Sequence, residues 1–317
     1  MSFESIDDEI EISIVSPVYM AEDLVDNLVL RIKNSVSKFT TKYEIILVED
    51  GGDDNSWQKI IDNCNKNPKI KGIKLSRNFG QQYALQAGLD SSRGNYVLTM
   101  DCDLQNRPEE IYKLYQKAKE GFEIVLGMRQ NRQDDWIKKI LSKYFYKVLG
   151  YLTGTIQDSS VSTFNIYHRK VINSIKDTKD YYRYYPILHQ LVGFKTFKVE
   201  VEHAERESGK SSYTLKTRFK LAIDTILNYS DKPIRIIMKI GFLISFFSIT
   251  FLIILGGRYY FGKSAVQEWE LLALLIGFFS GIIITTLGIV GLYVGRIFES
   301  VKGRPTYFID KVFKYEQ

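Results

Sequence analysis

Two long stretches without a charged residue lie toward the C-terminal end of the chain, and they limit what it can fold into more than any other feature. Ile240–Gly257 is the first and Leu271–Gly295 is the second. A helix needs roughly 20 consecutive apolar residues to cross the hydrocarbon core of a bilayer. Apolar residues between positions 234 and 238 extend the first stretch, and the Lys239 side chain can reach the bilayer interface. We therefore expect two transmembrane helices within residues 234–298, joined by a short external loop.

The charges beside these stretches predict the orientation of the chain in the membrane. Basic residues flank the outer ends: Lys232, Arg235 and Lys239 before the first stretch, and Arg296, Lys302, Arg304, Lys311 and Lys314 after the second. The connecting segment Arg258–Glu270 has two basic and two acidic residues. Positive flanks mark the cytoplasmic side, and Met1–Glu11 is acidic and polar, unlike a secretory signal. We expect an integral inner or plasma membrane protein with both termini in the cytoplasm.

Composition excludes several other classes of protein. The mean hydropathy is −0.15 and the net charge is +6. A basic chain can bind nucleic acid or an anionic membrane surface; with two apolar stretches present, we expect the membrane and no nucleic acid. Cys64 and Cys102 are too few for a disulfide framework, which fits a reducing compartment. The three histidines lack the spacing of metal ligands, so no zinc site is expected.

The first 130 residues alternate short apolar runs with helical patterns, which is typical of a parallel sheet with crossover helices. The expected strands are Ile12–Pro17, Tyr43–Glu49, Ile70–Leu75, Tyr96–Met100 and Glu123–Gly127. The expected helices are Glu22–Lys38, Ser56–Asn65, Gln81–Ser91 and Pro108–Glu120, with Asn55 or Ser56 capping the second and Pro108 in the first turn of the fourth. Such sheets bind ligands beyond the carboxyl ends of their strands. Four segments should converge there: Pro17–Tyr19, Glu49–Gly52, Asp101–Gln105 and Gly127–Arg129.

The region between this sheet and the membrane is predicted to be helical. Trp136–Leu152 is rich in Lys, Tyr and Phe, and Tyr213–Tyr229 sets apolar residues among basic ones. The second pattern suits a helix that lies in the membrane interface and leads into the first span. An amphipathic core helix is the alternative reading of the same residues.

Asp101-Cys102-Asp103 follows the fourth expected strand and is the candidate metal site. Residues two apart in an extended segment project to the same side, so both carboxylates can bind one hard divalent cation and a diphosphate. Gln105 continues this spacing and can add a carbonyl oxygen. The cation would neutralise charge on a leaving diphosphate. An acidic turn without a metal is the simpler alternative.

Glu49-Asp50-Gly51-Gly52 follows the second expected strand and is the candidate nucleoside site. Its carboxylates can accept hydrogen bonds from a base or ribose, and its glycines permit a tight turn. The sequence after the first strand is Pro17-Val18-Tyr19-Met20 rather than G-x-G-x-x-G, so we do not expect a dinucleotide-binding oxidoreductase. Tyr19 can stack on a base. A plain acidic turn and a buried tyrosine remain the alternatives.

Several short motifs occur in an order that resembles glycosyltransferase family 2, and more narrowly its polyprenyl-phosphate glycosyltransferases, the group that includes dolichol-phosphate mannose synthase. The motifs are Ile14-Val15-Ser16-Pro17-Val18-Tyr19, Glu49-Asp50-Gly51, Leu75-Ser76-Arg77-Asn78-Phe79-Gly80 and Met100-Asp101-Cys102-Asp103-Leu104-Gln105. The similarity continues through Gly127-Met128-Arg129, His203-Ala204-Glu205-Arg206, Gly209-Lys210-Ser211 and both apolar stretches. The ordered set is far more specific than any one of its members.

The resemblance implies a GT-A fold and an inverting transfer of sugar from a nucleotide donor, expected to be UDP-linked, to polyprenyl (undecaprenyl) phosphate for cell-envelope glycans. It implies Mg²⁺ or Mn²⁺ held by Asp101, Asp103 and Gln105. Nucleotide contacts would come from Pro17, Tyr19, Glu49, Asp50 and Asp101. The catalytic residues would be Asp103, Arg129 at a phosphate, and Arg206 and Lys210 on a mobile loop, since Arg and Lys suit phosphate oxygens. Lys138, Lys139 and Ser142 are candidate contacts to the acceptor phosphate, unless they only meet lipid headgroups.

The chain departs from the family pattern at two places. Glu49 stands where the family usually has aspartate. Many members have a Gly-Asp-Phe-Arg sequence whose aspartate is assigned as the general base, whereas here the sequence is Ser162-Thr163-Phe164-Asn165. Thr163 cannot be a base, and nothing shows that the nearby Asp158 replaces it. The acceptor is largely a dianion at pH 7, since a phosphate monoester has a second pKa near 6, so positioning and charge neutralisation can supply most of the acceleration.

The sequence predicts four parts: a cytoplasmic GT-A catalytic domain over 1–212, an interfacial helix over 213–233, two transmembrane helices over 234–298 and a cytoplasmic tail over 299–317. Small residues four apart in the second span, Gly277, Gly281, Gly291 and Gly295, predict a homo-oligomer packed through that helix. Two alternatives remain. A processive polysaccharide synthase would need a Q-x-x-R-W motif, which Gln190–Phe194 does not match, and more spans. A catalytically silent membrane scaffold would explain Thr163 and Glu49.

Overall fold

A computed structural model of the 317-residue chain describes residues 10–129, 147–155, 161–178, 185–202, 204, 223–260 and 268–315. The chain divides into two compact units, which we describe one at a time. The first unit comprises Met1–Lys147, Thr155–Thr214 and Pro305–Gln317. The second comprises Val148–Gly154 and Leu215–Arg304.

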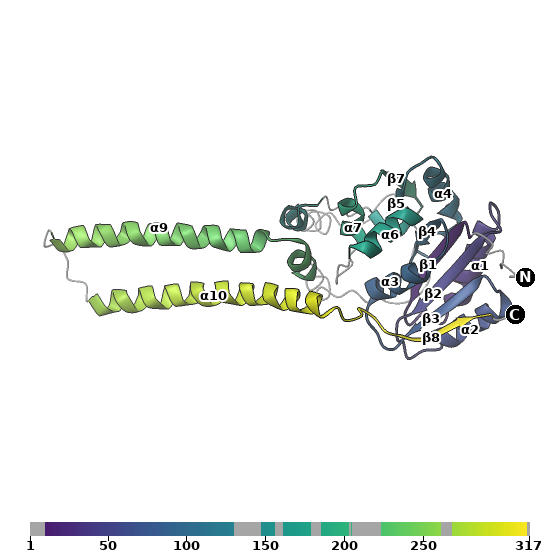
Figure 1. Cartoon of the computed structure of the whole chain (residues 1–317), viewed down its shortest axis with the longest axis horizontal. Helices are drawn as coiled ribbons and strands as arrows, with labels where there is room; N and C mark the ends of the chain where they lie inside the picture. Colours follow the sequence, from purple (N-terminus) through teal and green to yellow (C-terminus); the bar gives the residue numbers. More distant parts are fainter. Residues whose placement is uncertain are drawn as a thin grey trace, which may run out of the picture. The chain divides into compact units, whose positions relative to one another are not determined.

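In the first unit, the described residues form an eight-stranded sheet in the order β7-β5-β6-β4-β1-β2-β3-β8 (Figure 1). The strands are β1 (Ile12–Val18), β2 (Tyr43–Glu49), β3 (Ile70–Leu75), β4 (Tyr96–Thr99), β5 (Ile124–Arg129), β6 (Val161–His168), β7 (Thr196–Val201) and β8 (Ile309–Lys314). The helices include α1 (Val25–Val36), α2 (Ser56–Lys66), α3 (Gln81–Ser91), η1 (Pro108–Glu110), α4 (Ile111–Lys119), α6 (Arg169–Asp177) and α7 (Tyr185–Leu191). Strands β4, β1, β2 and β3 are parallel neighbours, as the sequence predicts.

The centre of the sheet is completely buried. Every residue of β1 and of β2 is buried, which explains why both strands are nearly continuous apolar runs in the sequence. Helix α1 contributes Leu28 and Ile32 to the core beneath them. Helix α3 approaches β1 closely because it has a glycine at the contact: a Cβ on Gly88 would lie 2.3 Å from Cγ1 of Val15. The strands that carry the candidate site are therefore rigidly placed.

Two details differ from the sequence-based expectation. Strand β6 pairs antiparallel with both β4 and β5, so the sheet is mixed rather than parallel throughout. Asn55 occupies the N-cap position of α2, but its side chain makes no capping hydrogen bond to the described residues. Instead, Oγ of Ser56 accepts a hydrogen bond from the Ala21 N–H at 3.0 Å and ties the start of α2 to the segment after β1. Pro108 opens η1, in agreement with its predicted place in a first turn.

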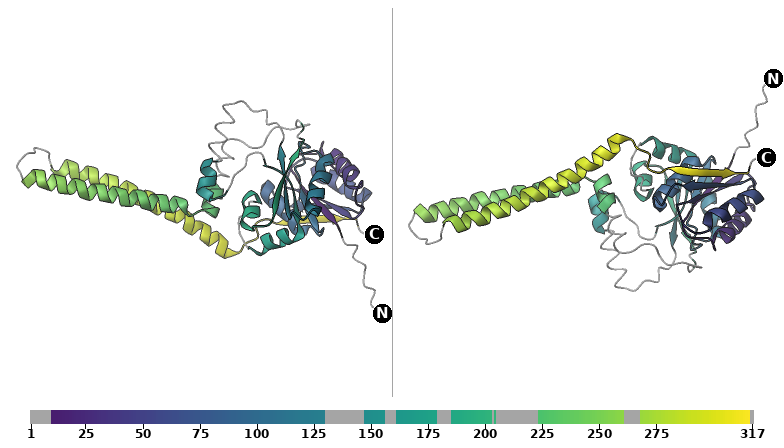
Figure 2. Two further views of the ribbon diagram at one scale, coloured as in Figure 1. Left: turned by 90° about the horizontal axis from the view of Figure 1, so that it is seen from above. Right: turned by 90° about the horizontal axis from the view of Figure 1, so that it is seen from below.

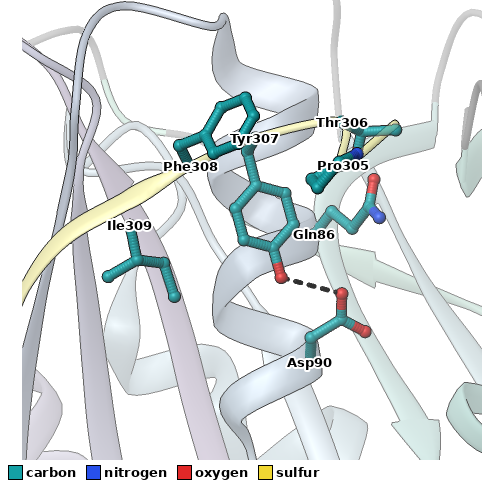
Figure 3. A pocket seen from close by; sticks show the side chains of 7 residues that line it. All are labelled: Gln86, Asp90, Pro305, Thr306, Tyr307, Phe308 and Ile309. Carbon is teal, nitrogen blue, oxygen red and sulfur yellow. Dashed lines mark hydrogen bonds between the residues drawn. The ribbon is translucent and has the colours of Figure 1, made fainter. Parts of the chain in front are cut away.

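The segment after the apolar stretches, which we expected to be a separate tail, contributes strand β8 to the sheet. β8 pairs antiparallel with β3, and the N–H of Ser76 donates to the carbonyl of Phe308 at 2.9 Å. Just before β8, the hydroxyl of Tyr307 donates to Oδ2 of Asp90 at 3.0 Å. A pocket of about 440 Å³ lies here, lined by Gln86 and Asp90 of α3 and by Pro305–Ile309 (Figure 3). The segment thus belongs to the first unit.

The second unit contains two long helices, α9 (Lys232–Tyr260) and α10 (Glu268–Lys302), which run side by side (Figure 2). Within the described part of the chain, one stretch is long and apolar enough to cross a membrane: Phe278–Lys302 of α10. Residues 223–229 are helical, while residues 213–222 lie outside the described ranges. The placement of this segment in a membrane interface remains a prediction. The guanidinium of Arg296 on α10 is hydrogen-bonded to Asp224 of that helix.

Candidate active site

The candidate site lies where the strand order changes direction. Strand β1 is the turning point: β2 and then β3 lie on one side of β1, and β4 lies on its other side. Open α/β sheets bind ligands at such a switch point, beyond the carboxyl ends of the strands. In the register of the sheet, Val15 is level with Ile46 and with Thr99. The segments that begin with Tyr19, Asp50 and Asp101 therefore emerge side by side.

Asp50 organises the loop that follows β3. It is only 2 % exposed, and its carboxylate accepts hydrogen bonds from the N–H of Phe79 at 2.8 Å and of Gly80 at 2.9 Å. Burial raises the pKa of Asp50 to about 6, in spite of these two donors. The sequence predicted a nucleoside contact for this residue. In the structure, both of its oxygens accept hydrogen bonds from the backbone just before α3.

Gly51 brings two of the sequence motifs into direct contact. Its φ of +64° favours glycine. A Cβ at this position would lie 2.2 Å from the carbonyl carbon of Arg77 and 2.3 Å from the nitrogen of Asn78. The turn formed by Glu49-Asp50-Gly51 therefore packs directly against the loop formed by Leu75–Gly80.

Glu49 has one buried carboxylate oxygen without a hydrogen-bond donor among the described residues. The side chain is completely buried, and its Oε1 accepts a hydrogen bond from the N–H of Gly52. Its Oε2 lies 4.0 Å from Nζ of Lys74 and has no hydrogen-bond donor among the described residues. Burial raises the pKa of this carboxyl above its usual value. A buried acceptor without a donor is costly, so the geometry suits the predicted contact to a nucleoside N–H or hydroxyl.

Tyr19 and Pro17 differ in their access to a ligand. The Tyr19 side chain is 44 % exposed, so its ring is available for stacking. Pro17 is buried within β1, level with Val48 of β2, and its predicted contact to the nucleotide remains a prediction.

The carboxylate of Asp101 is held from two sides. Nε2 of Gln81, the first residue of α3, donates to its Oδ1 at 2.5 Å. Oγ1 of Thr163 on β6 donates to its Oδ2 at 2.5 Å. From the sequence, no role was predicted for Gln81, and Thr163 was noted only because it cannot be the family's base. Gln81 directly follows the Leu75–Gly80 motif in the sequence, and this proximity was the one indication that it lies near the site.

Asp103 and Gln105 lie in a tight turn beyond Asp101. Oδ1 of Asp103 accepts a hydrogen bond from the N–H of Gln105 at 3.2 Å, and Leu104 between them has a φ of +57°. The carbonyl of Gln105 accepts from the N–H of Ala204 at 3.0 Å. This last contact places Ala204, three residues after the end of β7, next to the candidate metal site.

The oxygen donors at this turn fit a hard divalent cation. Carboxylate and carbonyl oxygens are the ligands that Mg²⁺ and Mn²⁺ prefer. No group of three or more His, Cys, Asp or Glu residues that could hold a metal ion occurs in the described ranges. Burial, followed by the charges of Asp101 and Asp103, raises the pKa of the intervening Cys102 thiol to about 12.

The other predicted site residues are placed only in part. Arg129 ends β5, whose carboxyl end lies at the same edge of the sheet as that of β4, with β6 between them. The candidate residues Arg206, Lys210, Lys138, Lys139 and Ser142, and also Asp158, lie outside the described ranges. Their predicted roles remain predictions.

Comparison with known proteins identifies relatives along almost the whole chain. Residues 13–176 match the model of the family described as glycosyl transferase family 2. An uncharacterized glycosyltransferase of Synechocystis sp., sll0501, is 34 % identical over 308 residues, which cover 97 % of each chain. The uncharacterized glycosyltransferase YkcC of Bacillus subtilis is also 34 % identical over 308 residues, covering 97 % of this chain and 95 % of its own length.

Solved structures show more distant similarity in fold. The Staphylococcus aureus protein TarS, in complex with UDP-GlcNAc, is 17 % identical with a TM-score of 0.46, covering 70 % of this chain and 67 % of its own. Glucosyl-3-phosphoglycerate synthase of Mycobacterium tuberculosis, in complex with Mn²⁺ and UDP-glucose, is 15 % identical with a TM-score of 0.45, covering 69 % and 77 %. The family match covers the switch point and the turns described above. The chain therefore belongs to glycosyltransferase family 2, whose members take sugar from a nucleotide donor.

Proposed function

We propose that this enzyme transfers a sugar from a UDP-linked donor to polyprenyl phosphate, with inversion, at the cytoplasmic face of the membrane. The observation that carries the proposal is the combination of two features in one chain. One is a family 2 site whose acidic turn suits a divalent cation. The other is α10, which contains a stretch able to cross a membrane. An acceptor that is itself anchored in the bilayer accounts for both features.

The residues of the switch point have distinct parts in this reaction. Glu49 and Tyr19 contact the nucleoside, and Asp50 holds the loop before α3. Asp101, Asp103 and Gln105 hold Mg²⁺ or Mn²⁺, which would neutralise the charge on the leaving diphosphate. Arg129, Arg206 and Lys210 bind phosphate oxygens, and Lys138, Lys139 and Ser142 contact the acceptor phosphate.

The acceptor needs no base from the protein. The hydroxyl of Thr163, which stands at the position of the family's base, donates a hydrogen bond to Asp101. A phosphate monoester is largely a dianion at pH 7 because its second pKa is near 6. Such a nucleophile attacks without losing a proton, so orientation and charge neutralisation supply the acceleration.

The path of the chain supports two spans with both ends in the cytoplasm. β8 follows α10 in the sequence and pairs with β3, which precedes α9. The segments before α9 and after α10 must therefore lie on the same side of the membrane. If α10 crosses the bilayer once, another segment must cross back, and the 29-residue helix α9 is long enough to do so.

The proposal is tested by mass spectrometry of lipid products. The full chain in detergent is incubated with undecaprenyl phosphate and a panel of nucleotide sugars. We expect one monosaccharide linked to the lipid phosphate, with product lost in EDTA and restored by Mg²⁺ or Mn²⁺. Products of increasing sugar number would indicate a processive synthase instead. Absence of any product with every donor, from protein that is folded, would favour the silent scaffold.

A further inference from the structure

The carboxylate of Asp101 accepts a hydrogen bond on each of its two oxygens. The Gln81 amide and the Thr163 hydroxyl reach it at 2.5 Å each, from α3 and from β6. A carboxylate held from two sides has a fixed orientation.

The Thr163 hydroxyl is itself held in place. The backbone of β6 pairs with β4, with Thr99 opposite Asn165. Oγ1 of Thr99 donates to the carbonyl of Thr163 at 2.7 Å, and the Thr99 side chain is only 2 % exposed. Threonine is also restricted at χ1 because it is branched at Cβ. The donor to Asp101 therefore comes from a strand in the sheet and not from a loop.

We propose that Thr163 is a positioning residue: its hydroxyl, together with the Gln81 amide, orients Asp101 to bind the divalent cation of the donor site. The inference rests on the proposed function, because it assumes that Asp101 is a metal ligand. It gives the position of the family's catalytic base a different task in this chain. Outer partners of this kind orient metal ligands, and their loss typically weakens metal binding or activity by 10–100-fold.

The geometry also predicts the effect of restoring an acidic residue. Aspartate at position 163 would place a second carboxylate where a donor now meets Asp101. Like charges in contact repel, and the orienting hydrogen bond would be lost. Thr163→Asp should therefore weaken metal binding and should not increase the rate of transfer.

The test measures Mn²⁺ affinity directly, by electron paramagnetic resonance of the free ion, with the full chain in detergent and saturating UDP-glucose. Thr163→Val removes the hydroxyl and keeps the shape, and we expect its Mn²⁺ affinity to fall by about 10–100-fold. Thr163→Ser keeps the hydroxyl, so its Mn²⁺ affinity should stay within about threefold of the wild-type value. Thr178→Val is the matched control, because that hydroxyl bonds only the carbonyl of Ile175 among the described residues, at the end of α6.

The outcomes separate the inference from the proposed function. Wild-type Mn²⁺ affinity in folded Thr163→Val would overturn the positioning role, while product formation by the wild type would leave the proposed function intact. A Thr163→Ser variant as weak as Thr163→Val would show that packing, not the hydroxyl, matters. If the wild type binds no Mn²⁺ with UDP-glucose present, both the inference and the metal mechanism are wrong, whatever lipid product is found.

Discussion

At the scale of single residues, Asp50 combines a structural contact with an unusual proton affinity. Burial raises its pKa to about 6 from the usual 3.8 of an aspartate. Between these two values the folded protein keeps a proton that the unfolded chain releases. Protonated Asp50 therefore favours the folded state at low pH, and this contribution is lost as the pH rises through about 6. Ionised Asp50 is the better acceptor for the two N–H groups that shape the donor site.

We predict that donor binding strengthens as the pH rises from 5 to 7. With a pKa of about 6, roughly one tenth of Asp50 is ionised at pH 5, so the affinity for UDP-glucose should be about tenfold lower there than at pH 7. UDP-glucose has no terminal phosphate monoester and hence no ionisation of its own near pH 6. Asp50→Asn should bind weakly at every pH, and the exposed Asp177→Asn should behave as the wild type in calorimetric titrations. A flat profile for the wild type would contradict the role of Asp50.

Gly51 is predicted to tolerate no side chain. Gly51→Ala combines a positive φ with a Cβ placed 2.2 Å from the backbone of Arg77, so the loss of stability should exceed the 1–3 kcal/mol typical of backbone strain alone. Gly121→Ala is the control: its φ is +100°, but no described atom lies within 4 Å of the added Cβ. Thermal unfolding in detergent should show a larger decrease for Gly51→Ala. Equal decreases would mean that the contact with Arg77 relaxes freely.

The sequence predicted the acidic residues of the site but not their partners. Glu49 and Asp101 follow buried parallel strands, whose continuous apolar runs are visible locally. The contact between Asp101 and Thr163 spans 62 positions and depends on β6 lying next to β4. A contact made by pairing of distant strands leaves no local pattern, so Thr163 was recognisable only as a departure from the family motif.

At the scale of elements, β8 and the residues before it support the loop that Asp50 organises. The ring of Phe308 lies 6.3 Å from the ring of Phe79, centroid to centroid, and the Phe308 carbonyl accepts from Ser76. The N–H of Phe79 in turn donates to Asp50. A segment that follows α9 and α10 in the sequence thus contacts the loop that Asp50 holds.

We predict that Phe308→Ala weakens UDP-glucose binding by about threefold to tenfold, since aromatic pairs of this geometry contribute about 0.5–1.5 kcal/mol. Tyr315→Ala is the control, because Tyr315 is partly exposed and lies just beyond β8. Affinity is measured by calorimetric titration with each full-length variant in detergent. Unchanged binding in Phe308→Ala would show that the loop keeps its shape without this ring.

Strands β6, β7 and β8 were not predicted from the sequence. For β8, the reason is that its own residues do not look like a buried strand. Residues in β8 are largely exposed, and the strand has charged residues on both faces, as edge strands commonly do. Such a segment looks like a solvated tail until β3 is available as its partner. The buried strands β2 and β3 and helix α3, in contrast, have the boundaries that the sequence predicted.

At the scale of the whole molecule, the predicted homo-oligomer depends on the glycines of α10. An added Cβ at Gly281, Gly291 or Gly295 meets no described atom within 4 Å, so these glycines are not used to bring α9 close. Small residues four apart let helices approach in a membrane. We propose a homo-oligomer packed through this helix, as the sequence predicts.

We predict that native mass spectrometry in mild detergent shows an oligomer for the wild type and a smaller species for the double variant Gly281→Leu, Gly295→Leu. Leucine side chains there would hold neighbouring helices apart. A double variant of exposed residues on the same helix, Ile284→Leu with Val294→Leu, is the control and should retain the oligomer. A monomeric wild type, or an oligomer unaffected by both leucines, would contradict this interface.

The pairing of β3 with β8 also has a consequence for synthesis. The thiol of Cys64 and the carbonyl of Phe313 are in contact although they are 249 positions apart, and both long helices are translated between them. At 5–20 residues per second, the nascent sheet has an open edge at β3 for some tens of seconds while these helices are made. An unpaired edge is a template for aggregation. Variants that weaken β8 should therefore reduce the yield of folded protein from the ribosome more than they reduce the activity of the molecules that mature.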